Sequence, residues 1–268
     1  HTMGKLVIVA SGKGGTGKTT FTSQVGTLLS TLGKMTVLVD ADAGFRNLDI
    51  ALGLESNVVY DYSDFISGNA DIDEILIKSP GYENLYFVAA PQRAATTDFD
   101  ADRTSRFWET LKSRFDYVLA DAPAGMGDGF RFASDYADEA LIVSLAESSS
   151  LRDADRVIEA FEEAEIEDIR LVLNRIRPEL IENKVLMNID DCIDVLSIPI
   201  LGIVPDDSAV TECVASGKPL SPSDNGAAQA FFNIARRMTG ENIPMMDFEN
   251  PSKKSIWSRM RKAFKKPQ

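Results

Sequence analysis

Cysteine and histidine are scarce in this sequence. Its 268 residues include two cysteines, Cys192 and Cys213, and neither belongs to a CxxC pair. The one histidine, His1, stands with Thr2 ahead of Met3 and is set aside as a cloning remnant. A histidine-based triad is therefore excluded, a disulfide scaffold or a zinc site is disfavoured, and a reducing compartment is expected.

Positive charge and long apolar runs are also lacking. The chain has 28 Lys and Arg against 41 Asp and Glu, a formal net charge of −13. An acidic body argues against non-specific nucleic-acid binding, which needs a basic surface. No run of 18 apolar residues is present, and no signal peptide precedes the first apolar segment. We therefore expect a cytosolic protein that does not span a membrane.

Apolar residues nevertheless make up 44% of the chain, and most of them gather in short continuous runs. Such runs are typical of parallel strands that are buried on both faces. We predict strands at 5–11, 36–42, 85–90, 116–123, 140–145, 169–175 and 199–204. We predict helices at about 18–32, 103–114, 151–164, 207–216 and 225–239. This alternation predicts an α/β fold with a doubly wound, mostly parallel sheet, whose ligands bind at the carboxyl ends of the strands.

The segment 12-GKGGTGKTT-20 follows the first predicted strand and opens the first predicted helix. It satisfies the pattern GxxxxGK[ST], whose glycines let backbone N–H groups turn toward phosphate oxygens at a helix N-terminus. In such a loop Lys18 reaches the β- and γ-phosphates, and Thr19 ligates Mg²⁺. The predicted nucleotide-binding residues of this loop are Gly12, Gly14, Gly15, Thr16, Gly17, Lys18, Thr19 and Thr20. Lys18 alone satisfies the pattern, so the additional lysine, Lys13, needs another explanation.

Aspartates stand at the ends of two further predicted strands, in 40-DADAGFRNLD-49 and 121-DAPAGMGDGF-130. A carboxylate there can hold Mg²⁺ through its water, or orient the water that attacks a phosphate. A lone strand-end aspartate is often only a helix cap or a turn residue. Here three of them, Asp40, Asp42 and Asp121, accompany the phosphate loop, which favours the functional interpretation.

Together these motifs resemble the MinD/ParA family of deviant Walker A ATPases. The loop KGGTGKTT resembles the family's Walker A motif, and the two aspartate segments resemble its switch I and switch II sequences. The resemblance covers nearly the whole chain, from Met3 to Gln268, and includes 58-VVYDYSDFISGNADIDEILIK-78. Thr16 departs from bacterial MinD, which usually has a small aliphatic residue there, although the partition relatives often carry threonine. The resemblance implies a P-loop ATPase that uses ATP and Mg²⁺.

The resemblance also assigns roles to the charged residues of the site. Lys13 would be the signature lysine, which reaches across an ATP-dependent homodimer to the partner's phosphates and acts in catalysis together with Lys18. Asp42 would position the hydrolytic water. Asp40 would support Mg²⁺ or the loop, and Asp121 would accept from Thr19 or from a Mg²⁺-bound water.

Two segments are expected at the adenine base. Asn174 ends the strand predicted at 169–175, and its donor and acceptor match the edge of adenine. The segment 202-GIVPDD-207 resembles the family's second base-contacting loop, with Pro205 and Asp207 nearest the base. A simple turn-forming role for Asn174 stays open. Nothing resembles the NKxD guanine-binding motif, so ATP is preferred over GTP.

The run 147-ESSSLRDADR-156 resembles the family segment that follows the fifth strand. By this resemblance Glu147 would approach the partner's nucleotide, and Asp153 would pair with Lys13 when no dimer holds it. Asp155 would belong to the surface that partner proteins contact. The run also fits a capped helix start with acidic residues in its first turn, and the two interpretations are compatible.

The composition changes near residue 241. A linker at 241–252 is followed by 253-KKSIWSRMRKAFKKPQ-268, which has seven Lys and Arg and no acidic residue. A helix here would carry a stripe of Ile256, Trp257, Met260 and Phe264, with basic residues such as Lys262 outside it. Basic amphipathic helices of this kind lie in the interface of anionic membranes. Packing on its own domain, nucleic-acid binding and disorder stay open for this segment.

We therefore expect an ATPase domain at 3–240, a linker at 241–252 and a membrane-binding helix at 253–268. The resemblance implies a peripheral ATPase on the cytoplasmic face of the inner membrane. It would dimerise with ATP, bind anionic lipids and recruit an FtsZ inhibitor of the MinC type to place the division septum. Whether a MinE-like activator exists stays open. A ParA-like DNA-partition ATPase and a flagellar-placement ATPase of the same family are the alternatives.

Overall fold

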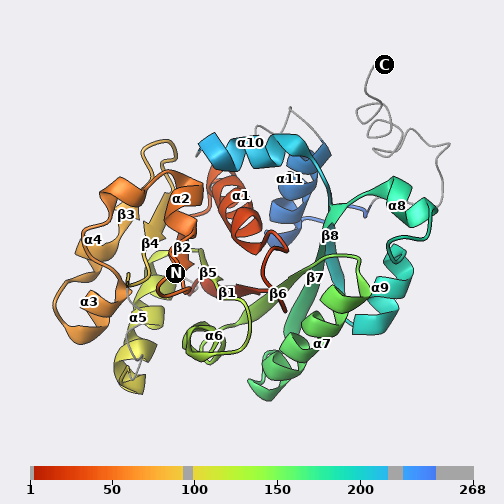
Figure 1. The fold of residues 1–268 in the computed structure, drawn as a ribbon. Helices are drawn as coiled ribbons and strands as arrows, with labels where there is room; N and C mark the ends of the chain where they lie inside the picture. Colours follow the sequence, from red (N-terminus) through yellow and green to blue (C-terminus); the bar gives the residue numbers. More distant parts are fainter. Residues whose placement is uncertain (1–2, 93–98, 217–225, 246–268) are drawn as a thin grey trace.

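The structure is a computed structural model that describes residues 3–92, 99–216 and 226–245. These residues form one eight-stranded sheet with helices on both faces (Figure 1). The strands are β1 (Lys5–Ala10), β2 (Thr36–Asp40), β3 (Ile77–Lys78), β4 (Leu85–Val88), β5 (Tyr117–Asp121), β6 (Glu139–Ser144), β7 (Asp168–Ile176) and β8 (Ile200–Pro205). Their order is β3-β4-β2-β5-β1-β6-β7-β8, and only the pair β3–β4 is antiparallel. The predicted α/β class is confirmed, whereas the helix predicted at 253–268 lies outside the described residues.

All five predicted helices are present. They are α1 (Lys18–Thr31), α5 (Ala101–Arg114), α7 (Ser148–Glu163), α10 (Ser208–Ser216) and α11 (Gly226–Met238). Shorter elements were not predicted: α2 (Leu48–Leu52), α3 (Tyr62–Ser67), α4 (Ile72–Ile75), α6 (Asp128–Ser134), α8 (Pro178–Glu182), α9 (Ile189–Leu196) and the 3-10 turn Glu55–Asn57. None of them exceeds eight residues, too few for a helical period to stand out in the sequence.

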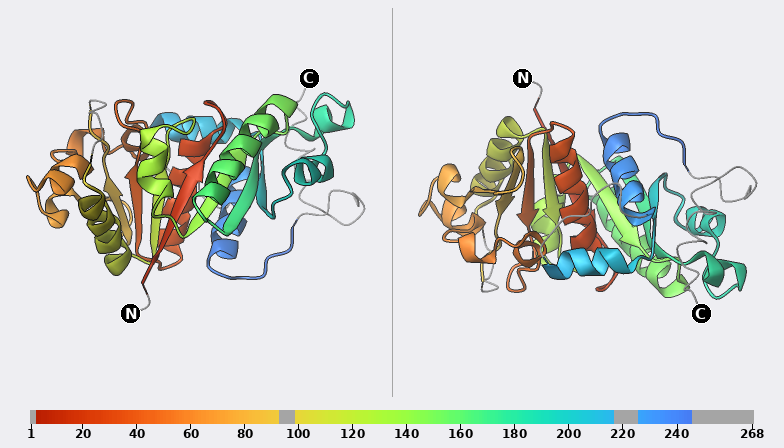
Figure 2. Two further views of the ribbon diagram at one scale, coloured as in Figure 1. Left: turned by 90° about the horizontal axis from the view of Figure 1, so that it is seen from below. Right: turned by 90° about the horizontal axis from the view of Figure 1, so that it is seen from above.

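The sheet separates two apolar cores, because its strands are buried on both faces. In β1, Leu6 and Ile8 face one core while Val7 and Val9 face the other, and none of these side chains is exposed. Helices α1 and α11 close one core; α5, α6 and α7 lie over the opposite face, as the views from above and below show (Figure 2). The continuous apolar runs of the sequence therefore correspond to a sheet with neither face exposed to solvent.

Strand β1 lies at the point where the chain changes direction across the sheet. It pairs with β5 on one side and β6 on the other. In open α/β sheets, ligands bind outside the carboxyl ends of the strands at such a point. The predicted site residues of the ATPase domain lie at the carboxyl ends of β1, β2, β5, β6, β7 and β8 or in the segments that follow these strands.

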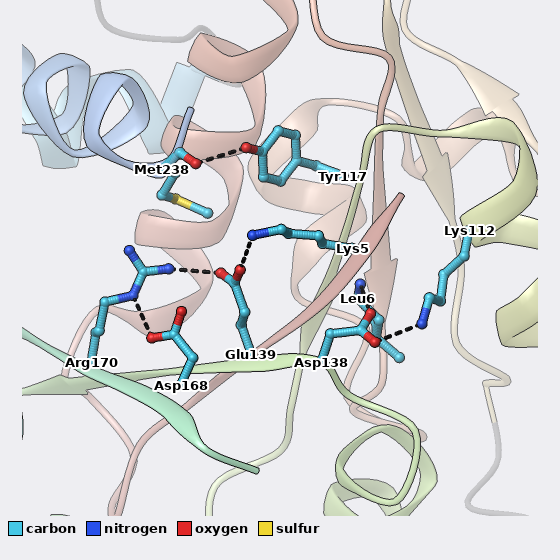
Figure 3. Close-up of polar contacts among 9 residues, drawn as sticks. All are labelled: Lys5, Leu6, Lys112, Tyr117, Asp138, Glu139, Asp168, Arg170 and Met238. Atoms are coloured by element: carbon cyan, nitrogen blue, oxygen red, sulfur yellow. Dashed lines mark hydrogen bonds and ion pairs between the residues drawn. The ribbon is translucent and has the colours of Figure 1, made fainter. Parts of the chain in front are cut away.

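A network of ion pairs lies at the amino ends of the strands, on the side of the sheet away from the phosphate loop (Figure 3). Glu139, 6% exposed at the start of β6, accepts from Lys5 of β1 and from Arg170 of β7, whose Nη2 lies 2.6 Å from its carboxylate. Arg170 Nε also lies 3.0 Å from Asp168. One buried carboxylate thus joins three neighbouring strands far from the nucleotide loop.

We expect Glu139→Ala to lower the free energy of unfolding by about 2 kcal/mol, because Arg170, whose side chain is only 19% exposed, loses its hydrogen bond to this carboxylate and keeps only Asp168. Urea unfolding measures the loss, and nucleotide affinity should not change. Asp73→Ala is the matched control, since it removes an ion pair with Arg114 that lies on the surface. Equal stability of the two variants would show that the Glu139 network contributes nothing.

Candidate functional site

The phosphate loop runs from the end of β1 at Ala10 to the first residue of α1, Lys18. Gly15 and Gly17 have φ values of 83° and 88°, a region that strains residues with side chains. A Cβ atom on Gly12 would lie 2.2 Å from the backbone of Asp153, and one on Gly17 would lie 2.4 Å from Nδ2 of Asn174. The loop therefore needs glycine both for its turn and for its close contacts.

Asp121, at the end of β5, is the centre of the site. It is 1% exposed and accepts hydrogen bonds from Lys18 Nζ at 2.9 Å, Thr19 Oγ1 at 2.6 Å and Thr22 Oγ1 at 3.1 Å. The structure thus brings together the predicted lysine and threonine at the start of α1 and the predicted aspartate at the end of β5. Thr22 was not predicted, although it lies one helical turn after Lys18 and so faces the same side of α1.

Asp40 and Asp42 lie beside this centre. Asp40 accepts from the N–H groups of Asp42 at 2.9 Å and Leu48 at 3.1 Å, so its carboxylate supports the loop between β2 and α2. Burial, together with the charge of Asp121, raises the pKa of Asp40 to about 7. Burial also raises the pKa of Asp42, an effect that the positive charge of Lys18 opposes. Asp42 faces the phosphate pocket, where a base or a water-orienting group would act.

Two pockets meet along the loop. A pocket of about 390 Å³ is lined by Ser11, Gly14, Gly15, Thr16, Gly17, Lys18, Thr19, Thr20, Asp42, Asn47, Ile50, Ala51, Ala124 and Arg175. A second, of about 260 Å³, is lined by Gly17, Thr20, Asn174, Arg175, Val204, Pro205, Asp206, Asp207, Val210, Thr211 and Ala215. They share Gly17, Thr20 and Arg175, so the surface offers a groove with a phosphate end and a base end. Arg175 was not predicted as a site residue.

Asn174 is placed at the base end but is already bonded to the loop. Its Nδ2 donates to the carbonyl oxygen of Thr16 at 2.8 Å, and its side chain is buried. Pro205 and Asp207 line the same pocket, and Asp207 caps α10 by accepting from the N–H of Ala209 at 3.0 Å. The hydroxyl of Thr16 is buried without a hydrogen-bond partner among the described residues. That position therefore suits an aliphatic side chain as well as a threonine.

Lys13 points away from its own phosphate pocket. Its Nζ lies 3.4 Å from Glu147 Oε2 and 3.3 Å from Ser149 Oγ, at the start of α7. We expected Asp153 as this partner, and the structure corrects that: the backbone of Asp153 packs against Gly12, and Glu147 instead meets the lysine. Both charged side chains are about one third or more exposed, so the pair contributes at most about 1 kcal/mol. Asp155 lies exposed on the same helix.

The membrane residues predicted in the tail lie outside the described residues: Ile256, Trp257, Met260, Lys262 and Phe264. Among the helices that the structure describes, none is long and apolar enough to cross a bilayer. The described residues also contain no cluster of three His, Cys, Asp or Glu that could hold a metal ion. Thr19 and Asp121 nevertheless offer oxygen atoms that can act as Mg²⁺ ligands. Mg²⁺ that binds together with a nucleotide needs only one or two ligands from the protein.

Comparison with known proteins decides the family. Residues 7–220 match the model of the CobQ/CobB/MinD/ParA nucleotide binding domain. The chain belongs to this MinD/ParA family. The phosphate loop and the three aspartates Asp40, Asp42 and Asp121 therefore lie within a nucleotide-binding domain.

Within the MinD/ParA family the chain is similar to MinD proteins over most of its length. It is 42% identical to the septum site-determining protein MinD of Synechocystis sp. over 248 residues, 92% of this chain and 93% of that one. The MinC:MinD cell division protein complex of Aquifex aeolicus superposes with a TM-score of 0.84 at 36% identity, covering 91% of this chain and 99% of that one. The septum site-determining MinD of Pyrococcus horikoshii, complexed with Mg-ADP, superposes with a TM-score of 0.76 at 27% identity, covering 88% and 96%.

Proposed function

We propose that this protein is a septum-placing ATPase that dimerises with ATP, attaches to anionic membrane through residues 253–268 and recruits a division inhibitor. Its cofactors are ATP and Mg²⁺, in keeping with the Mg-ADP complex of the Pyrococcus horikoshii relative. The observation that carries the proposal is the position of Lys13. This lysine does not line its own phosphate pocket, and it is held by a weak, half-exposed pair with Glu147 and a hydrogen bond to Ser149.

The chemistry at each pocket follows from the arrangement of its side chains. Lys18 binds the β- and γ-phosphates in place of its present contact with Asp121. Thr19 and Asp121 would hold Mg²⁺, which draws electron density from the phosphate oxygens. Asp42 orients the attacking water, whose oxygen bonds to the γ-phosphorus as the bond from the γ-phosphorus to the ADP oxygen breaks, which releases ADP and inorganic phosphate. Lys13 of the partner subunit then neutralises the charge that develops on the γ-phosphoryl group, as an arginine finger does.

The last described residues of the chain are held against the edge strand β8. The guanidinium of Arg237 donates to the carbonyl oxygens of Leu201 at 3.0 Å, Ile243 at 2.9 Å and Pro244 at 2.9 Å. Arg237 thereby ties Ile243 and Pro244 to β8. Only seven residues separate Met245 from Lys253, a tether of at most about 25 Å. The short tether supports a membrane anchor that holds the ATPase domain close to the lipid surface.

The partner surface is proposed on α7. Its exposed Asp155 and the nearby Glu147 offer acidic groups next to the nucleotide loop, so binding there can depend on the nucleotide. The Aquifex aeolicus relative was solved as a MinC:MinD complex, which supports a MinC-like inhibitor as the partner. A MinE-like activator would act on the same dimer by raising its slow hydrolysis.

Co-sedimentation with anionic liposomes tests the proposal directly. We expect the full-length protein to pellet with phosphatidylglycerol-containing vesicles in ATP and Mg²⁺, and to remain in the supernatant in ADP, because only the ATP-bound dimer presents two anchors. Neutral phosphatidylcholine vesicles are the control. Equal pelleting in both nucleotides would contradict the switch, and salt-sensitive binding to DNA in ATP would favour a partition ATPase instead.

A further inference from the structure

Strand β7 is irregular at the point where it reaches the groove. Leu173 pairs with Ile203 of β8, and the next pair joins Ile176 to Pro205, so β7 advances three residues while β8 advances two. Leu171, Leu173 and Ile176 all pack in the core on the α7 side. In a regular strand, residue 175 rather than 176 would face that core.

One extra residue is therefore inserted in β7 after Asn174, which is a β-bulge. Bulges beside binding sites re-aim side chains that a regular strand would bury or turn away. Here the side-chain amide of Asn174 donates to the phosphate loop, and the side chain of Arg175 is exposed instead of facing the core. Both polar residues at the end of β7 thus reach the same groove from one strand.

The backbone of Arg175 is strained to achieve this. Its φ is 54°, the left-handed region that costs a non-glycine residue about 1–2 kcal/mol. Its neighbours maintain this conformation, because Asn174 is bonded to Thr16 and Ile176 is fully buried and accepts from the N–H of Asp206 at 2.9 Å. Strained residues that the surrounding structure enforces cluster at binding sites.

The side chain of Arg175 lies where the two pockets meet. It lines both of them, and its Nε would lie 3.7 Å from a Cβ atom built on Gly17. Within the described part of the chain its guanidinium has no ion pair, whereas its neighbour Arg177 lies 3.8 Å from Asp206.

We propose that Arg175 is a nucleotide-binding residue whose guanidinium contacts the phosphate chain at the α-phosphate. The inference rests on the proposed function, in which the base occupies one pocket and the β- and γ-phosphates the other. Any nucleotide that fills both pockets carries its α-phosphate past Gly17, Thr20 and Arg175, the three residues that the pockets share. A planar guanidinium with several donors suits a phosphate better than a base edge.

The test compares Arg175→Asn with Lys184→Asn. Lys184 is a matched control because it is also an exposed cation with a positive φ, 57°, and it lines neither pocket. Asparagine tolerates the left-handed region, so neither substitution adds strain. We expect Arg175→Asn to raise the Kd of both ATP and ADP about tenfold or more, since a hydrogen bond to a charged group is lost. Lys184→Asn should bind as the original protein does, and Arg175→Lys should recover part of the affinity.

Isothermal titration calorimetry with ATP and ADP, together with thermal unfolding of each nucleotide-free variant, separates the outcomes. An unchanged Kd in Arg175→Asn, or a loss confined to ATP, would overturn the inference, because the α-phosphate is common to both nucleotides. A midpoint of unfolding well below that of Lys184→Asn would make Arg175 a structural residue and would overturn it too. If the unsubstituted protein binds neither nucleotide, the proposed function fails instead.

Discussion

Lys13→Ala should lower the ATP turnover of the lipid-bound protein by about 10³-fold or more while leaving the binding of ATP to one subunit nearly unchanged. A cation that a partner supplies to a γ-phosphoryl group accelerates its transfer by about 10³–10⁵-fold. Lys13 contributes nothing to the lining of its own pocket, so affinity in the monomer should not depend on it. Phosphate release measures the turnover, and size-exclusion chromatography in a non-hydrolysable ATP analogue measures the dimer, which we also expect to weaken.

Mixed dimers show from which subunit the lysine acts. Lys13→Ala and Asp42→Ala are each expected to be inactive alone. In a mixed dimer, the pocket of the Lys13→Ala subunit keeps its own Asp42 and receives Lys13 from its partner. Random mixing of equal amounts should restore up to about a quarter of the original turnover, because half the dimers are mixed and each has one complete site. If the mixture stays inactive, Lys13 works within its own subunit. Lys34→Ala is the control, because Lys34 lies in the turn after α1 and lines neither pocket.

The parts of this site that the sequence predicts are those encoded by neighbouring residues. The phosphate loop needs only eight consecutive residues after a strand, and its glycines, Lys18 and Thr19 lie as predicted. Asp121 was also predictable, because carboxyl ends of parallel strands meet at one edge of the sheet. Its contact with Thr19 at 2.6 Å follows from the pairing of β1 with β5.

Features that depend on distant segments escaped prediction. Whether Lys13 meets Glu147 or Asp153 depends on where α7 starts relative to the loop, which no local pattern encodes. The bulge at Arg175 is a mismatch between β7 and β8 and appears only when the two strands are paired. Strand β3 has two residues and pairs antiparallel with β4, so its short apolar stretch offered no period to detect.

Ending the chain at residue 252 should abolish sedimentation with anionic liposomes in ATP while leaving nucleotide binding and dimerisation intact. The removed segment carries seven Lys and Arg, each worth about 1 kcal/mol near an anionic leaflet, and the apolar side chains of Trp257 and Phe264. A single short segment of this kind binds weakly, and its pairing in a dimer raises avidity by about 10²–10⁴-fold. Loss of the anchor should therefore remove the dependence of sedimentation on ATP entirely.

Two full-length variants separate charge from apolar contact in this anchor. Trp257→Gln with Phe264→Gln keeps every positive charge and should still lose most of the binding, because an interfacial helix needs its apolar face. Lys262→Gln removes one charge and should weaken binding only a few-fold, more so at low salt. If the chain that ends at residue 252 still pellets in ATP, the membrane contact lies on the ATPase domain and residues 253–268 have another role. If only the charge change matters, the segment binds as an unstructured basic tail rather than as an amphipathic helix.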